Sequence, residues 1–157
     1  MSEKFEFIGE HDRPALLAFS APAWLETART AAQELGYLVH TAATHGDFSI
    51  RFSQVRYQLV LIEECFAANS LAENATLQEL QTMPMNQRRH ATVILLGNSF
   101  QTFTPMQAFQ QSVNAVINGS ELFLLKQLIE QAVSDNARFL RGFNEAQRRV
   151  FGQGQLD

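Results

Sequence analysis

The hydrophobic residues of this chain fall into five short runs, and most segments between the runs repeat apolar residues at spacings of three and four. An uninterrupted apolar run predicts a strand buried on both faces, and the wider spacing predicts an amphipathic helix. The five predicted strands cover residues 15–19, 37–41, 57–62, 91–96 and 113–117. Their alternation with helices predicts a three-layer α/β fold, a doubly wound parallel five-stranded sheet between helices.

Several predicted helices have recognisable ends. Pro22 suits the first turn of the first helix, and Gly36 suits its C-terminal end. Ser-Leu-Ala-Glu at 70–73 has the form of a capping box and predicts the start of a third helix, which Pro84 ends. Thr-Pro-Met-Gln at 104–107 predicts a second capping box, with proline at the first helical position.

The last predicted helix is longer than coverage of the sheet requires. A helix over residues 121–151 would span about 46 Å, whereas residues up to about Val133 suffice for the sheet. We therefore divide the chain into a domain over 1–134 and a helical extension over 135–157. As an alternative, the helix bends back at Gly142 and covers its own domain, because glycine costs about 1 kcal/mol in a helix interior.

The extension carries apolar residues at the alternating spacings of three and four that form the seam of a coiled coil. A single asparagine at an a position of such a seam commonly sets its register and favours two strands. We expect this seam to bind a partner, and a second copy of the chain above all. The candidate interface residues are Asn136, Phe139, Phe143, Ala146 and Val150.

Composition and charge mainly exclude function classes. With 46% hydrophobic and 18% charged residues the chain is expected to fold, and its net charge of -4 makes nucleic acid a poor partner. The single cysteine and the spacing of the four histidines suggest no metal site, and no cofactor motif occurs. No apolar run approaches the ~18 residues of a membrane span, and no signal peptide is visible. We expect a cytoplasmic protein without membrane insertion.

Five β-α units within about 120 residues, Pro22 soon after the first strand, and the strand Tyr-Gln-Leu-Val-Leu-Ile ending in an acid together resemble a known family. That family is the receiver domain of bacterial two-component response regulators, and the resemblance covers residues 15 to about 134. It implies a flavodoxin-like fold, a role in signal transduction, and a site at the carboxyl ends of the strands.

The residues that an active receiver uses for phosphorylation are replaced in this chain. The resemblance implies an acidic pair for Mg²⁺ after the first strand, an acceptor Asp after the third, a hydroxyl after the fourth and a Lys after the fifth. These positions hold, in order, Phe19 and Ser20, Glu63, Gly97 and Asn118. Phenylalanine cannot ligate a metal, and the longer Glu displaces the carboxylate by about 1.5 Å, a shift that can cost ~10²-fold in rate. We expect a pseudo-receiver, not an enzyme, with no catalytic residue, Mg²⁺ or phosphoryl group.

Three functions stay open from the sequence. The first is a phosphorylation-independent signalling module that dimerises through its last helix and binds another signalling protein. The second is a sensor domain, the N-terminal regulatory part of a longer protein, that binds a small molecule or nucleotide in the altered pocket through Ser20, Glu63, Asn98, Ser99 and Asn118. The third is residual phosphorylation of Glu63, whose carboxylate is otherwise either a stand-in for a phosphorylated Asp or a solvated strand-end acid.

Overall fold

A parallel sheet of five strands forms the centre of the computed structural model, which describes the backbone of residues 8–155 and the side chains of residues 8–150. The spatial order is β2-β1-β3-β4-β5, so the direction of winding reverses between β1 and β3. The predicted doubly wound, flavodoxin-like sheet is confirmed. The strands are β1 (Pro14–Ala18), β2 (Leu38–Ala42), β3 (Leu59–Glu63), β4 (Thr92–Gly97) and β5 (Ala115–Asn118).

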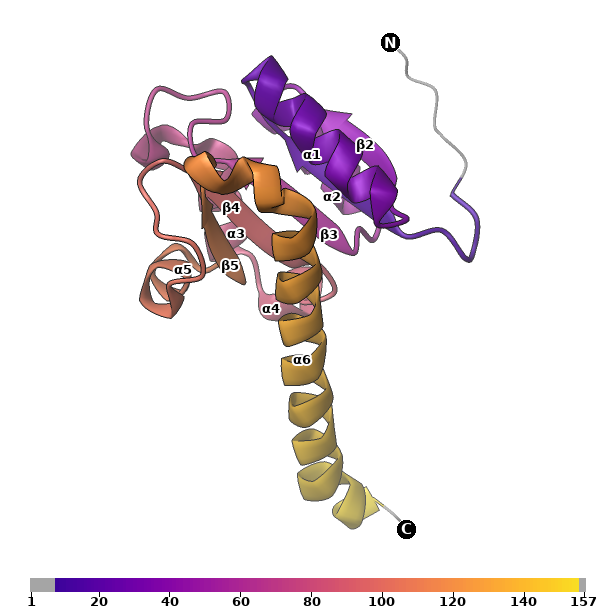
Figure 1. The fold of residues 1–157 in the computed structure, drawn as a ribbon. Coiled ribbons are helices and arrows are strands. Elements are labelled where there is room, and N and C mark those ends of the chain that lie inside the picture. The colour runs from indigo at the N-terminus through magenta and orange to yellow at the C-terminus, as the bar shows by residue number, and fades with distance from the viewer. Residues whose placement is uncertain (1–7, 156–157) are drawn as a thin grey trace.

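Helices cover both faces of the sheet (Figure 1). On one face lie α1 (Pro22–Glu34) and the first part of α6 (Leu125–Gln155), which follows the 3-10 helix η2 (Gly119–Leu124). The other face is covered by α2 (His45–Gln54), α3 (Ala75–Thr82) and α5 (Pro105–Gln111). Two short helices, η1 (Leu71–Glu73) and α4 (Met85–Arg88), flank α3 in the chain.

The core consists of two apolar layers, one on each face of the sheet. Alternate strand residues feed them: Leu16 and Ile62 point to the layer under α2, α3 and α5, while Leu17 and Leu61 point to the layer under α1 and α6. All four side chains are fully buried, which is worth roughly 1.5–3 kcal/mol for each. A shift of one residue in strand register would exchange the two layers, so packing fixes the register.

The third helix begins later than its predicted capping box. Residues 71–73 form the 3-10 helix η1, and the Ser70 side chain makes no capping hydrogen bond. Helix α3 starts at Ala75 instead, where Asn74 Oδ1 accepts a hydrogen bond from the Leu77 N–H at 3.1 Å. The predicted start was wrong because the side-chain amide of Asn74 lies closer to the apolar residues of α3. Its oxygen accepts one of the free N–H groups in the first turn of that helix.

The second predicted capping box is also wrong in its contacts. Helix α5 does begin with Pro105 in its first turn, after Thr104. The Thr104 side chain makes no capping hydrogen bond, however, and Gln107 Oε1 accepts the N–H of Gln101 at 2.8 Å. Gln107, which the motif assigns to the helix cap, therefore binds the loop before α5 instead.

Helix α6 continues without a break for 31 residues and leaves the body of the domain in its C-terminal half (Figure 1). Its first part is anchored by the buried side chains of Leu125, Ile129 and Ala132. The helix passes straight through Gly142, where an added Cβ would meet nothing within 4 Å. The alternative of a bend at Gly142 is therefore wrong. No helix in the described part of the chain is both long and apolar enough to cross a membrane.

Arg88 of α4 joins the ends of two helices, α3 and α5. Its guanidinium donates to the carbonyl oxygen of Leu80, near the end of α3, at 2.8 Å and to that of Ser112, after α5, at 2.6 Å. Burial lowers the pKa of Arg88 from its usual value. Carbonyl groups at helix C-termini carry partial negative charge, which compensates the buried cation.

We predict that Arg88→Met destabilises the domain by about 2–3 kcal/mol, because two charge-assisted hydrogen bonds are lost and two carbonyl groups are left without donors. Arg89→Met is the matched control. Arg89 is exposed and lies over the Phe143 ring at 5.3 Å, a contact worth about 0.5–1 kcal/mol at an exposed site. Urea unfolding of both variants measures the difference, and equal losses would contradict this role of Arg88.

Candidate functional site

Glu63 closes the carboxyl edge of the sheet between β3 and the loop after β1. Its Oε1 accepts the backbone N–H of Ser20 at 2.6 Å and that of Ala21 at 3.0 Å, directly before α1. A carboxylate is favoured there because the first N–H groups of a helix lack partners within the helix and carry partial positive charge. The Ser20 Oγ in turn accepts the N–H of Ala67 at 2.7 Å. Glu63 is thus half-buried and bound to the backbone.

Glu64 closes the neighbouring part of the same edge, over β4. Its Oε2 accepts the hydroxyl of Ser99 at 2.6 Å, and its Oε1 accepts the N–H of Ser99 at 3.2 Å. On the way the Glu64 side chain crosses Gly97, where an added Cβ would overlap with Glu64 Oε1. Gly97, the position expected from the resemblance to hold the switch hydroxyl, therefore has no room for a side chain while Glu64 keeps this place.

Beside β5 the edge is covered by Trp24 of α1. A Cβ at Gly119 would lie 2.5 Å from Trp24 Cη2 and 2.6 Å from Asn98 Oδ1, so both side chains pack directly on this glycine. Asn118, at the position of the receiver's lysine, bonds within its own loops: its Nδ2 donates to the carbonyl of Phe100 at 2.7 Å, and its Oδ1 accepts the N–H of Ser120 at 2.8 Å.

Asn74 holds the acidic turn in place, and the sequence analysis missed this role. The side chain is fully buried, and its Nδ2 donates to the carbonyl oxygens of both Glu63 and Glu64 at 3.1 Å. The same side chain caps α3 through Oδ1. An asparagine just before an apolar helical segment is a signal that could have predicted the cap, but not the contacts with β3.

His45 ties the loop after β3 to α2 and α3. Its Nδ1 accepts the N–H of Thr76 at 3.1 Å, which assigns the ring proton to Nε2, and Nε2 lies 3.1 Å from the carbonyl oxygen of Ala67. Ala67 has a positive φ of 49°, a conformation that costs a non-glycine residue energy and needs support from its surroundings. The bonds from Ser20 and His45 supply that support.

The structure brings the five predicted pocket residues to one edge, but the Phe19 side chain points into the core. Ser20, Glu63, Gly97 and Asn118 follow or end the strands at the carboxyl edge. Phe19 is only 6% exposed and packs in the core layer under α1 and α6. It continues the alternation of Ala15 and Leu17, so the period of two already indicated the core.

The residues at this edge do not fit Mg²⁺. Phe19 offers no ligand, Glu63 Oε1 already accepts two N–H groups, and Glu64 binds Ser99. Within the described part of the chain, no three His, Cys, Asp or Glu side chains are grouped so as to hold a metal ion. Burial, and then the charges of Glu64 and Glu63, raise the pKa of the nearby Cys65 thiol, which disfavours a reactive thiolate.

Asn136, the first residue of the predicted seam, bonds within its own domain. Its Nδ2 donates to Thr92 Oγ1 at 2.9 Å, and its Oδ1 accepts the amide of Asn114 at 3.3 Å. Thr92 begins β4 and Asn114 precedes β5. The asparagine thus fixes α6 against the amino ends of two strands.

The remaining seam residues point away from the domain or lie at its rim. Phe139 is 67% exposed, Phe143 38% and Val150 70%, and Ala146 is exposed as well. The two phenylalanine rings stack with centroids 6.5 Å apart. Two exposed aromatic rings on one helix face form an adhesive stripe.

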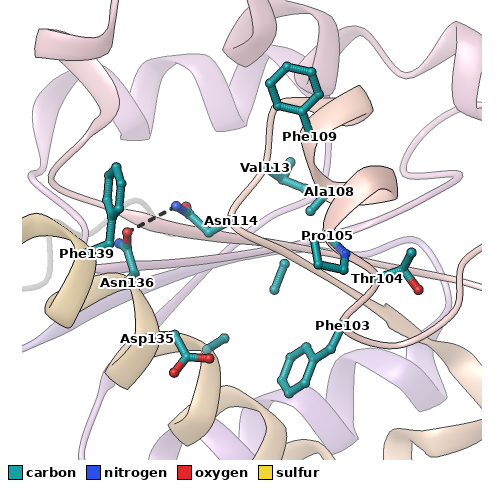
Figure 2. A pocket seen from close by; sticks show the side chains of 12 residues that line it. Phe103, Thr104, Pro105, Ala108, Phe109, Val113, Asn114, Asp135, Asn136 and Phe139 are labelled. Carbon is teal, nitrogen blue, oxygen red and sulfur yellow. Dashed lines mark hydrogen bonds between the residues drawn. The ribbon is translucent and has the colours of Figure 1, made fainter.

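The stripe is continuous with an apolar hollow on the domain. Figure 2 shows a cavity between α5 and α6, with Phe109 on one side and Phe139 on the other. Its volume is about 410 Å³, and Phe109 is 79% exposed. On the other side of Phe139 a smaller hollow of about 200 Å³ is lined by Met85 and Phe143. Exposed apolar side chains of the extension and of the face around β5 therefore lie along neighbouring hollows, whose linings also contain the polar residues Asn114, Asp135 and Asn136.

No family model and no curated protein matches the sequence of the chain. Solved structures do match its fold. A response regulator receiver domain protein (CheY-like) from Methanospirillum hungatei JF-1 is 15% identical with a TM-score of 0.62, over 81% of this chain and 98% of that one. The protein described here therefore has the fold of a response-regulator receiver domain.

Two further solved structures have a similar fold, but their names describe other kinds of protein. A putative pilus assembly-related protein from Burkholderia pseudomallei K96243 is 16% identical with a TM-score of 0.57, over 83% of this chain and 96% of that one. A fusion of the yeast Spc42 trimeric coiled coil to another structure is 14% identical with a TM-score of 0.60, over 94% of each chain. At these identities the similarity concerns the fold.

We predict that Gly97→Thr, which restores the receiver's hydroxyl, destabilises the domain by about 1–3 kcal/mol, because its side chain overlaps with Glu64. Glu64→Gly in the same chain should recover part of that loss, because it removes the carboxylate and also the Glu64 Cβ, which lies 2.5 Å from the added Cβ. Gly46→Thr is the control, since nothing lies within 4 Å of a Cβ there. Thermal unfolding of the single and double variants measures the coupling, and strictly additive losses would contradict the steric account.

Proposed function

We propose that this protein is a phosphorylation-independent interaction module, non-enzymatic and cytoplasmic, that works by dimerising through α6 and binding another signalling protein. The observation that carries the proposal is the exposed Phe139–Phe143 stripe on a helix that leaves the domain. In these terms residues 1–134 are the receiver-like domain and residues 135–157 are the extension for assembly.

The closed carboxyl edge supports independence from phosphorylation. A phosphoryl acceptor must present a free carboxylate oxygen while cations neutralise the charge that develops on the transferred group. Glu63 Oε1 accepts the N–H groups of Ser20 and Ala21, which fixes the orientation of the carboxylate against the backbone. In the described part of the chain, Lys126 pairs with Glu34 at 3.8 Å and not with Glu63. In this proposal the Glu63 carboxylate holds the loop after β1 permanently, where a receiver would bind a phosphoryl group reversibly.

The energetics favour an interface larger than the two phenylalanine rings. Burial of Phe139 and Phe143 is worth roughly 3–6 kcal/mol in one protomer, while association costs about 4–15 kcal/mol in lost freedom. A stable dimer therefore needs further apolar area from the domain. The neighbouring surface with Phe109 and Met85 supplies it, so the proposed interface combines the extension with α4, β5 and α5.

The seam starts at Phe139 in this proposal. Asn136 is already bonded to Thr92 and Asn114, so it aims the helix from inside the domain and does not face a partner asparagine. Ala146 and Val150 continue the seam one and two turns beyond Phe143. The similarity of the whole chain to a domain fused to a coiled coil supports a helix of this kind as an assembly element.

The sensor hypothesis has less support at the carboxyl edge. Ser20, Glu63 and Asn118 are bonded to neighbouring loops, and Trp24 covers Gly119, so a ligand would have to displace several internal contacts. Residual phosphorylation of Glu63 meets the same obstacle.

We predict that the protein is a dimer and that Phe139→Asp with Phe143→Asp makes it a monomer, since each charge would have to be buried in an apolar interface. Phe123→Asp is the control, because Phe123 is 80% exposed in η2 and lies outside the proposed surface. Light scattering over a concentration series gives the masses. An unchanged mass in the double variant would refute dimerisation through the stripe.

We also predict no incorporation of label from radioactive acetyl phosphate in the presence of Mg²⁺. Glu63→Gln shows whether any label is attached to Glu63. This variant keeps the size of the side chain but replaces the negatively charged carboxylate with a neutral amide. Stoichiometric label in the original chain that disappears in Glu63→Gln would show that Glu63 is a phosphoacceptor, against the proposal.

A further inference from the structure

A cleft of about 400 Å³ lies at the amino edge of the sheet, opposite the edge that receivers use for phosphorylation. It is enclosed by the residues that precede β1, β2, β3 and β4 and by the middle of α6. We call it the amino-edge cleft. Its walls contain the side chains of Arg13, Arg56 and His90, and no Asp or Glu is among the described residues that line it.

The two arginines give the cleft a positive charge in a chain whose net charge is -4. Arg13 is fixed in position: its guanidinium stacks over the Tyr37 ring at 4.2 Å and donates from Nη1 to the carbonyl of Leu35 at 3.0 Å. Arg13 carries five N–H donors, and the bond to Leu35 uses one of them. Arg56 has no hydrogen bond and no ion pair among the residues that the structure describes.

His90 adds polar atoms that lack partners. Both of its ring nitrogens are buried, and neither makes a hydrogen bond within the described part of the chain, while the ring stacks on Phe52 at 5.5 Å. Burial, and then the charge of Arg56, lowers the pKa of His90 below 6.5. Buried polar groups without partners are rare in native proteins. His90 and Arg56 also line a neighbouring cavity on the side of α2, together with Glu79, so they lie between that cavity and the amino-edge cleft.

The remaining wall of the cleft combines the polar residues Gln58, Thr92 and Asn136 with an apolar part. Tyr37 is buried beside Arg13, and Val133 and Leu140 of α6 are half-buried on the opposite side. Small-molecule sites typically combine apolar walls with a few convergent polar groups in volumes of about 300–1,000 Å³. The cleft fits this description, with the charged groups gathered at the strand ends.

We propose that the amino-edge cleft binds a small organic anion, a phosphate or carboxylate on an apolar body. The anionic group lies between Arg13 and Arg56, where two guanidinium groups can share its oxygens. The apolar body packs on Tyr37 and on the turn of α6 that carries Leu140. This assignment depends neither on dimerisation nor on the closed carboxyl edge.

The test is a titration of the full chain with phenyl phosphate, followed by ¹H–¹⁵N spectra at low salt. We expect saturable shifts confined to residues around the cleft, and an upward shift of the His90 titration midpoint as the anion offsets the charge of Arg56. Inorganic phosphate lacks the apolar ring and phenol lacks the anionic group. Each should therefore bind at least about tenfold more weakly than phenyl phosphate.

Arg56→Gln should weaken phenyl phosphate binding at least about tenfold without unfolding the domain, because Arg56 is exposed and makes no internal bond among the described residues. Arg29→Gln is the matched control: this arginine pairs with Glu26 on α1, away from the cleft, and its loss should leave binding unchanged. The proposal is overturned if Arg56→Gln binds as well as the original chain or if the shifts spread over the whole surface. It is also overturned if phenol or inorganic phosphate binds equally well.

Discussion

The hydrogen bonds that the N–H groups of Ser20 and Ala21 donate to the Glu63 carboxylate are the constraint on which the carboxyl edge of this domain depends. Hydrogen bonds to a charged group contribute about 1.5–3 kcal/mol each, enough to hold the loop after β1 against β3. From there the contacts continue through Ser20 to Ala67 and His45, so one carboxylate organises the loops of three strands.

Because internal hydrogen bonds close the carboxyl edge of the sheet, the function that we propose lies on other surfaces of the domain. Helix α6 starts in the core, is fixed by the bonds of Asn136 to Thr92 and Asn114, and then presents Phe139 and Phe143 outside the domain. The amino-edge cleft touches the same helix on its other side, near Leu140. A molecule bound there would contact the turn from which the exposed stripe begins, so both proposed surfaces meet at the base of the extension.

The sequence was sufficient for the sheet because buried parallel strands read as continuous apolar runs, and every predicted strand is present within a few residues. Local motifs were less reliable: neither Ser70 nor Thr104 makes a capping hydrogen bond, Asn74 caps α3 instead, and α5 has no side-chain cap. Heptad spacing likewise identified a face of α6 and could not show that Asn136 meets Thr92, a residue 44 positions away. Contacts between distant segments, such as Asn74 with the acidic turn, depend on how the loops close and leave no local pattern.

The most direct test of this account is the hydrogen exchange of the Ser20 and Ala21 amides, measured by NMR with and without acetyl phosphate and Mg²⁺. The account predicts slow exchange of both amides in the free protein, loss of that protection in Glu63→Ala, and no change on adding the phosphoryl donor. Fast exchange in the free protein, or a change in protection with acetyl phosphate and Mg²⁺, would contradict it and show that the edge is open to phosphoryl chemistry.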